Sequence, residues 1–185
     1  MNYRPISLLP TISKVFEKLI AKQLKPFTQK FFSKYLCGFR KGLSSQYAIL
    51  NMIRKWQSSL RTSGKVGAVL MDLSKAFDCL PHDLLLAKMA AFGFGPWSLK
   101  LFSNYLNNRK HRVRIGSSIS EFLEILLRVP QGSVLGPILF NIFVNDLLAS
   151  VTESNFADDN PLYAGDADSE SVVRRLKNDL QLVSK

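Results

Sequence analysis

Residues 151–164 read VTESNFADDNPLYA and place two adjacent carboxylates, Asp158 and Asp159, between two short apolar stretches. Residues 151–156 and 162–164 are predicted to be strands, with the aspartates in the tight turn between them. Acidic residues are common in turns, because Asp accepts hydrogen bonds from nearby backbone N–H groups. Taken alone, the pair therefore indicates a catalytic site only weakly.

A third carboxylate, Asp72, strengthens this hypothesis. It follows residues 66–71, a continuous apolar run typical of a buried strand. A charge at the end of such a strand is costly unless a partner compensates it, and a divalent cation would do so. Magnesium takes oxygen ligands, and two ions about 3.5–4 Å apart stabilise the attacking and leaving oxygens of a phosphoryl transfer. The sequence predicts a metal site at Asp72, Asp158 and Asp159, although spacing alone does not establish that they converge.

The first predicted helix begins near residue 11, where Thr11 can serve as the N-cap. Its apolar stripe consists of Ile12, Val15, Phe16, Leu19 and Leu24. A second stripe on the same helix is basic and consists of Lys14, Lys18, Lys22 and Lys25.

The remaining elements mix helices with short strands. Helices are predicted from about residue 44 to 62, from Pro81 to about residue 93, and over residues 97–106. Residues 109–127 are predicted to form a hairpin that turns at 116–118. A Gly- and Pro-rich loop at 130–137 leads into a helix that ends near Leu148, and a last helix begins at Ser169 or Ser171. Without repeats or linkers, this order argues for one α/β or α+β unit rather than a bundle or sandwich.

The formal charge of +11 is unevenly distributed. Residues 1–71 hold thirteen Lys or Arg against one acid, Glu17; residues 72–145 hold eight against five, and residues 146–185 four against eight. A basic half beside an acidic end suits a polyanionic partner held near a carboxylate cluster. The alternative interpretation is a solvated lysine-rich surface.

Several classes of protein are excluded or disfavoured. With 46% apolar and 21% charged residues the chain is globular, and no stretch reaches the roughly 18 to 20 apolar residues of a membrane span. Residues 1–5 lack the basic and apolar regions of a signal peptide. Cys37 and Cys79 have no metal-site spacing and are expected to be reduced thiols. An intracellular location, nuclear or cytoplasmic, is therefore expected.

Five stretches resemble motifs of reverse transcriptases, in the order that these enzymes have them. Residues 156–159 (FADD) resemble the F/Y-x-D-D turn, residues 68–78 (AVLMDLSKAFD) the first palm motif, and residues 129–137 (VPQGSVLGP) the loop-to-helix motif between them. Residues 2–7 (NYRPIS) and 38–42 (GFRKG) are similar to fingers motifs. A bare Asp-Asp pair is weak, but five ordered motifs that cover nearly the whole chain are specific. Their wording is similar to that of LINE-type (non-LTR) retrotransposon enzymes of the jockey-like sort.

The resemblance implies the fold and the activity. The expected fold is α+β, with the fingers and palm of a reverse transcriptase, a small antiparallel sheet backed by helices, and no thumb. Residues 1–185 would be a reverse transcriptase domain fragment, with fingers in about 1–65 and the palm, with fingers insertions, in about 66–185. The implied activity is that of an RNA-directed DNA polymerase, which adds dNTPs to a primer 3′-hydroxyl by two-magnesium nucleotidyl transfer. Mn²⁺ is an alternative ion, and the implied partners are an RNA template and a DNA primer.

The resemblance also assigns roles to residues. Asp72 and Asp158 would hold both ions, with Asp159 adjacent. Phe77 falls at the steric-gate position, where a ring under the sugar would exclude a ribose 2′-hydroxyl; otherwise it is a core aromatic. The residues implied to contact the nucleotide are Arg4 through the triphosphate, Phe77, Gln131 and Gly132. The nucleic-acid contacts would be Arg40, Lys41, Arg109, Lys110, Arg112 and Arg114, although a solvated hairpin face explains the last four equally well.

Three features depart from the family pattern. Arg128 stands where these enzymes usually have Gly, and would strain the loop if that position needs a positive φ. Pro161 stands where a polar residue is usual, and it removes a ladder donor, which is tolerable at an edge or at a first strand position. The thumb, primer grip and endonuclease of a parent polyprotein are expected but absent. We therefore expect a partial or decayed element copy with little or no processive synthesis.

Three rival interpretations remain. An RNA-dependent RNA polymerase shares the two-aspartate palm, but Phe77 and the residues Phe156 and Ala157 argue against it. A group II intron maturase shares the fingers motifs, although the wording of residues 73–78 and 129–137 favours the retrotransposon type. The third is a non-catalytic RNA-binding relic that keeps the basic face without turnover. In each polymerase or relic case, binding to nucleic acid should weaken steeply with salt.

Overall fold

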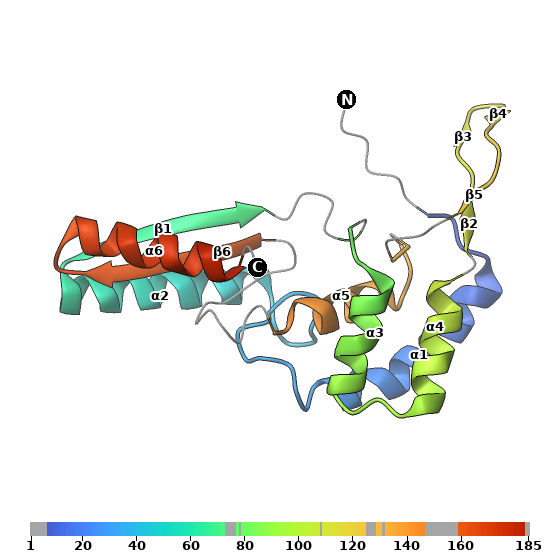
Figure 1. Ribbon diagram of the computed structural model, residues 1–185, viewed down its shortest axis with the longest axis horizontal. Helices are drawn as coiled ribbons and strands as arrows, with labels where there is room; N and C mark the ends of the chain where they lie inside the picture. The colour runs from blue at the N-terminus through green and yellow to red at the C-terminus, as the bar shows by residue number, and fades with distance from the viewer. Residues whose placement is uncertain are drawn as a thin grey trace. The chain divides into compact units, whose positions relative to one another are not determined.

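The computed structural model (Figure 1) describes residues 7–72, 77, 79–107, 109–124, 129–130, 132–146 and 159–183, with the backbone alone for Asp72, 159–161, 182 and 183. The chain divides into two compact units, each made of two segments. Unit 1 comprises Met1–Phe31 and Lys75–Phe143, and unit 2 comprises Phe32–Ser74 and Val144–Lys185. Within the described ranges, no helix combines the length and apolar character that crossing a bilayer requires.

Unit 1 is built mainly of helices around one buried segment. Its elements are α1 (Thr11–Thr28), α3 (His82–Ala91), α4 (Pro96–Leu106), β2 (Lys110–His111), β3 (Arg114–Ile115), β4 (Ser118–Ile119), β5 (Leu123–Glu124) and most of α5 (Gly136–Val144). Ile138, Leu139, Phe140 and Ile142 of α5 are all buried, and so is Asn141 between them. A helix that is buried on every side belongs to the core of its unit. The short strands pair as β2–β5 and β3–β4, which confirms the predicted hairpin.

Helix α1 buries a different face from the one that its apolar stripe indicates. The buried residues are Glu17, Ala21, Leu24 and Thr28, which recur at the spacing of one helical face. By contrast, Ile12 is 83% exposed and Leu19 61% exposed. Thr11 is also not the N-cap: Pro10 holds that position, without a side-chain hydrogen bond. Leu24 of the predicted stripe is buried, but the other four members are at least half exposed. The predicted cap and most of the predicted stripe were therefore wrong, because a carboxylate with hydrogen-bond partners, described below, takes the inward position.

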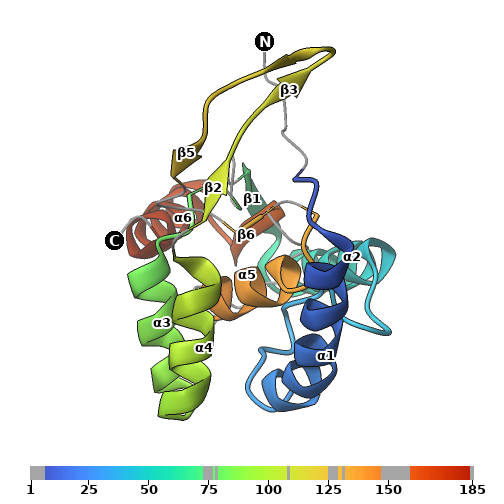
Figure 2. The same cartoon turned by 90° about the vertical axis from the view of Figure 1, so that its right-hand side faces the viewer.

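Unit 2 contains the longer sheet. Its elements are α2 (Ser45–Ser63), β1 (Lys65–Asp72), β6 (Asp159–Asp166) and α6 (Ser169–Val183). β1 and β6 are antiparallel, with Lys65 opposite Asp166 at one end and Asp72 opposite Asp159 at the other. Figure 2 shows α6 and α2 on opposite sides of this ladder. The α+β class, with a small antiparallel sheet backed by helices, is confirmed.

Strand β1 is not buried on both faces as its apolar run indicates. Val69 and Met71 pack with Leu162, Ala164, Val172 and Leu176 in a core cluster between the ladder and α6. Leu70, one residue out of phase, is 76% exposed. In the described part of the chain β6 pairs with β1 alone, and Pro161 lies opposite Leu70 within that ladder. The alternation follows from the period of two in a strand: successive side chains of β1 point to opposite faces of the ladder, so α6 covers only every second one.

The ends of α2 and α6 are set by local polar groups. Ser44 caps α2, since its hydroxyl accepts a hydrogen bond from the Tyr47 backbone N–H at 3.2 Å, and Gly64 ends the helix with φ 81°. The predicted bounds of this helix are thus confirmed. α6 begins at Ser169, one of the two predicted starts, but its cap is Asp168, whose carboxylate accepts from the Ser171 N–H at 2.9 Å. Backbone hydrogen bonds from Ser171 and Glu170 to this carboxylate lower the pKa of Asp168.

Gly67 of β1 gives α6 room to approach the ladder. A Cβ atom at this position would lie 2.6 Å from Cγ1 of Val172 and 3.1 Å from Cδ1 of Leu176. Gly67→Ala is therefore expected to lower the free energy of unfolding by about 1–2 kcal/mol through overpacking. Urea denaturation would measure the free energy of unfolding of this variant, of Val172→Ala, which removes the atom that the new Cβ would meet, and of the double variant. If Gly67→Ala costs as much in the Val172→Ala background as in the unmodified chain, the close contact is not the cause.

Candidate active site

The β1–β6 ladder brings two of the three predicted metal ligands to the same end of the sheet. Asp72 is the last residue of β1, Asp159 is the first of β6, and the register places them opposite each other. Directly opposite residues in an antiparallel ladder have Cα atoms about 4.5–5.5 Å apart. Asp158 lies outside the described residues, as does the predicted strand 151–156. Two positions that are distant in the sequence thus lie side by side on adjacent strands.

These carboxylates are chemically suited to hold magnesium. Mg²⁺ takes oxygen ligands and is typically bound through one or two carboxylates together with substrate phosphates. Among the residues with described side chains, no group of three or more His, Cys, Asp or Glu could hold a metal ion. The predicted ligands lie outside that set, so the fit rests on their residue type and on the ladder register.

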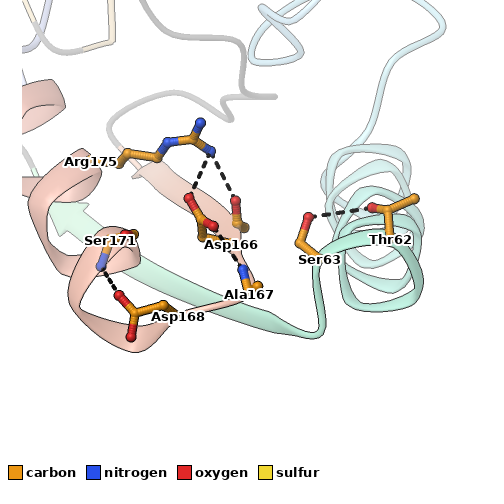
Figure 3. Close-up of polar contacts among 8 residues, drawn as sticks. Thr62, Ser63, Asp166, Ala167, Asp168, Ser171 and Arg175 are labelled. Atoms are coloured by element: carbon orange, nitrogen blue, oxygen red, sulfur yellow. Dashed lines mark hydrogen bonds and ion pairs between the residues drawn. The ribbon is translucent and has the colours of Figure 1, made fainter.

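The opposite end of the ladder is tied to α6 (Figure 3). Arg175 donates from Nη1 to the backbone carbonyl of Gly165 at 3.0 Å and lies 3.7 Å from Oδ2 of Asp166. Asp166 Oδ1 accepts from the Ala167 N–H at 2.8 Å, and the Asp168 cap follows directly. The half-exposed ion pair contributes little free energy by itself, but the combined contacts hold the turn between β6 and α6. β6 is therefore anchored at the end away from Asp159.

The loop that precedes α5 has a defined shape in unit 1. Ser133 donates its backbone N–H to the carbonyl of Pro130 at 3.0 Å, and Gly132 between them has φ 97°, a value that favours glycine. The Ser133 hydroxyl then accepts from the Gly136 N–H at 2.9 Å and so caps the helix. Gln131 lies outside the described residues. Gly132 is thus required by the turn, whatever it contacts in a complex.

Glu17 is a buried carboxylate that the sequence analysis did not single out as a site residue. It is 1% exposed, and its Oε2 accepts from the Val134 N–H at 2.6 Å and from the Leu135 N–H at 3.4 Å. Its Oε1 accepts from the Tyr105 hydroxyl at 2.9 Å. Burial, and then the Glu17 charge, raise the pKa of Tyr105, so the hydroxyl stays protonated and continues to donate. Its isolation as the only acid in residues 1–71 was the one sequence signal for this role.

Phe77 lies beside α5 with its ring on the core of unit 1. Its ring centroid is 4.6 Å from that of Phe140, with the planes at 29°, and Phe140 is 1% exposed. The Phe77 carbonyl accepts from the Val129 N–H at 3.0 Å. The Phe77 ring itself is half-buried. The described contacts are compatible both with a core aromatic and with a gate that presents one edge of the ring.

The basic residues predicted to bind nucleic acid differ in the contacts that their side chains make within the chain. Arg40 donates from Nη1 to the carbonyls of Ser33 and Leu36, at 2.7 and 3.0 Å, so part of its guanidinium shapes its own loop. Lys41 is exposed. In the hairpin of unit 1, Arg109 lies over the Tyr105 ring at 4.5 Å and Arg112 over the Phe122 ring at 4.9 Å. The other hairpin candidates, Lys110 and Arg114, are exposed, and Arg4 lies outside the described residues.

Comparison with known proteins adds a family to this geometry. The family model described as "Reverse transcriptase (RNA-dependent DNA polymerase)" matches residues 1–185. The "Probable RNA-directed DNA polymerase from transposon BS" of Drosophila melanogaster is 34% identical over 148 residues, which are 79% of this chain and 16% of that protein. The "RNA-directed DNA polymerase from mobile element jockey" of the same organism is 29% identical over 186 residues, 99% of this chain and 20% of that protein. The chain thus spans about a fifth or less of the length of these relatives.

A solved structure supports the fold alone. The structure of apo telomerase from Candida Tropicalis, truncated from the C-terminal domain, matches with a TM-score of 0.61 and 11% identity. The match covers 91% of this chain and 37% of the telomerase chain. At this identity the likeness concerns the path of the backbone and not the residues of a site.

Proposed function

The chain belongs to the reverse transcriptase (RNA-dependent DNA polymerase) family, and we propose that it is fingers-and-palm sequence that adds deoxynucleotides to a primer 3′-hydroxyl. The similarity to jockey-like non-LTR retrotransposon polymerases that the motifs indicated is confirmed. The observation that best supports the activity is the pairing of Asp72 with Asp159 at one end of the β1–β6 ladder. Family membership alone would leave open whether these two positions meet.

In this proposal Asp72, Asp158 and Asp159 hold two Mg²⁺ ions, with Mn²⁺ as an alternative. When bound, such ions lower the pKa of the primer hydroxyl and neutralise charge on the triphosphate. The chain's own contribution is positioning. Arg4 would bind the triphosphate, Phe77 would limit the space beside the sugar, and Gln131 and Gly132 would contact the incoming nucleotide.

The proposed polymer partners are an RNA template and a DNA primer. Lys41, Lys110, Arg112 and Arg114 are exposed cations, which supports contacts with phosphates. Arg40 and Arg109 are half-buried, and we propose that they contact nucleic acid with the part of the guanidinium that faces outward. An intracellular location and a parent protein with thumb and endonuclease domains belong to the same proposal.

Addition of dTTP to an oligo(dT) primer on a poly(rA) template tests this function. We expect Mg²⁺-dependent addition of one or a few nucleotides, abolished by EDTA, with little extension into long products. Long products would contradict the expected lack of processivity while supporting the polymerase itself. If the chain binds the primer–template in a salt-sensitive way but adds nothing with Mg²⁺ or Mn²⁺, the non-catalytic RNA-binding relic is the better reading.

A further inference from the structure

We propose that Glu17 is a positioning residue for nucleotide addition, which holds the loop of residues 129–135 in the shape that receives the incoming nucleotide. The inference rests on the proposed function, because it assumes that Gln131 and Gly132 meet the nucleotide. It adds a residue of α1 that lies 117 positions from the loop to which it bonds.

The contacts of Glu17 use both oxygens of the carboxylate. Oε2 accepts from the backbone N–H groups of Val134 and Leu135, at 2.6 and 3.4 Å, and Oε1 accepts from the Tyr105 hydroxyl at 2.9 Å. At 1% exposure these donors, rather than water, stabilise the charge. Hydrogen bonds to an ionised acceptor are stronger than neutral ones, so the carboxylate of Glu17 holds Val134 and Leu135 more firmly than a neutral acceptor would.

The Glu17 contacts complete the start of α5. The first N–H groups of a helix have no partner within the helix, and negative charge is stabilising at that end. Ser133 supplies its hydroxyl to Gly136, and Glu17 supplies its carboxylate to the two residues before the helix. At the other end of α5, Lys88 Nζ donates to the Phe143 carbonyl at 2.6 Å. The charges at the two ends of α5 thus oppose the helix dipole.

The loop is fastened on both sides of the predicted nucleotide contacts. On one side the Val129 N–H donates to the Phe77 carbonyl at 3.0 Å. On the other side Glu17 holds Val134 and Leu135. The tight turn from Pro130 to Ser133 lies between these two attachments. Releasing Glu17 would therefore free one end of the segment that carries Gly132, while the Phe77 attachment remains.

A purely structural role for Glu17 would give a different result from a positioning role. General loosening would weaken nucleotide binding, primer–template binding and thermal stability together. Loss of positioning would raise the KM for dTTP and leave primer–template binding nearly unchanged. Of the basic residues proposed to bind nucleic acid, only Arg109 is connected to Glu17 in the interactions described above, through the Tyr105 ring. The split between these quantities is the deciding measurement.

The experiment compares Glu17→Gln and Glu17→Ala with the unmodified 185-residue chain. Single additions of dTTP on poly(rA)/oligo(dT) give KM and kcat, and fluorescence anisotropy gives the Kd for the primer–template. Hydrogen–deuterium exchange of a peptide that covers residues 129–136 reports on the loop without relying on activity. Tyr105→Phe removes one of the three donors, and Glu170→Gln on the exposed first turn of α6 is the matched control for loss of one negative charge.

We expect the KM for dTTP to rise about tenfold in Glu17→Gln and further in Glu17→Ala, as loss of a charged hydrogen bond predicts. Primer–template Kd should stay within about twofold, the 129–136 peptide should exchange faster, and Glu170→Gln should match the unmodified chain. An unchanged KM for dTTP in Glu17→Gln would overturn the positioning role. So would a rise in KM that is matched by an equal rise in the primer–template Kd and by faster exchange throughout the chain. If Glu17→Ala does not fold, Glu17→Gln decides. Failure of the unmodified chain to add or bind dTTP would instead remove the proposed function, and this inference with it.

Discussion

Replacing Asp72 with Asn is expected to lower Mg²⁺-dependent addition of dTTP at least about 1,000-fold, the scale of losing a main electrostatic contribution to a transition state. The substitution keeps the size and shape of the side chain and removes its charge. Asp72 ends β1 opposite Asp159, so the loss would fall on the pair of positions at that end of the ladder. The strand itself should remain intact, because the ladder hydrogen bonds are made by the backbone.

The same sheet offers a matched control for this variant. Asp166 lies at the far end of the ladder, opposite Lys65, and its carboxylate accepts from the Ala167 N–H and pairs with Arg175 (Figure 3). Asp166→Asn makes the same chemical change to the same sheet, and its rate should stay within about twofold of the unmodified chain. Initial rates on poly(rA)/oligo(dT), with thermal melting followed by circular dichroism, would measure both variants. An Asp72→Asn variant that melts normally and keeps more than about a tenth of the rate would remove Asp72 from the proposed metal site.

Replacing Phe77 with Val is expected to lower the preference for dTTP over UTP about 100-fold, expressed as the ratio of the two kcat/KM values. The physical reason is steric. An aromatic ring beside the sugar would collide with a 2′-hydroxyl, and Val leaves that space open. The ring is held by stacking on Phe140 at 4.6 Å, so it cannot move aside without disturbing the core of unit 1.

Phe16→Val is the control for the Phe77 variant. Phe16 lies in the same unit on α1 and is 50% exposed, so it undergoes the same change of side chain outside the Phe77–Phe140 stack. Loss of the aromatic stack should also cost Phe77→Val about 1 kcal/mol of stability, which a melting curve would detect. A variant that loses stability while its discrimination between dTTP and UTP is unchanged would show that Phe77 is a core aromatic and not a gate.

Local patterns predicted the elements of unit 2 well. The bounds of α2 followed from Ser44 and Gly64, and both residues act at the helix ends as expected. The apolar run before Asp72 correctly indicated a strand, but not how much of it is covered. Two helices on a two-stranded ladder leave positions such as Leu70 exposed, and a single strand sequence does not reveal how many neighbours the sheet will have.

Helix α1 shows why the rest could not be predicted. Its apolar periodicity pointed to a face with Ile12 and Leu19, whereas the structure buries Glu17. Burial of a carboxylate is tolerated only where hydrogen-bond donors replace water. Here the donors are backbone N–H groups just before α5 and the Tyr105 hydroxyl. Those donors are more than 80 residues away in the sequence. The predicted fingers and palm boundary near residue 65, and the roles of the site residues, stay predictions.

The scarcity of acids around Glu17 in the sequence also has a consequence for the rate at which the chain associates with RNA. It is the only carboxylate among residues 1–71, and with its charge inside the unit, the exposed ionised side chains of that segment are all cationic. A chain with a net charge of +11 attracts a polyanion from beyond contact distance, which raises the rate constant of association, and mobile counterions suppress this effect. The association rate constant for RNA should therefore fall with ionic strength. Glu17→Gln should change that dependence little, because it alters a net charge of +11 by a single unit.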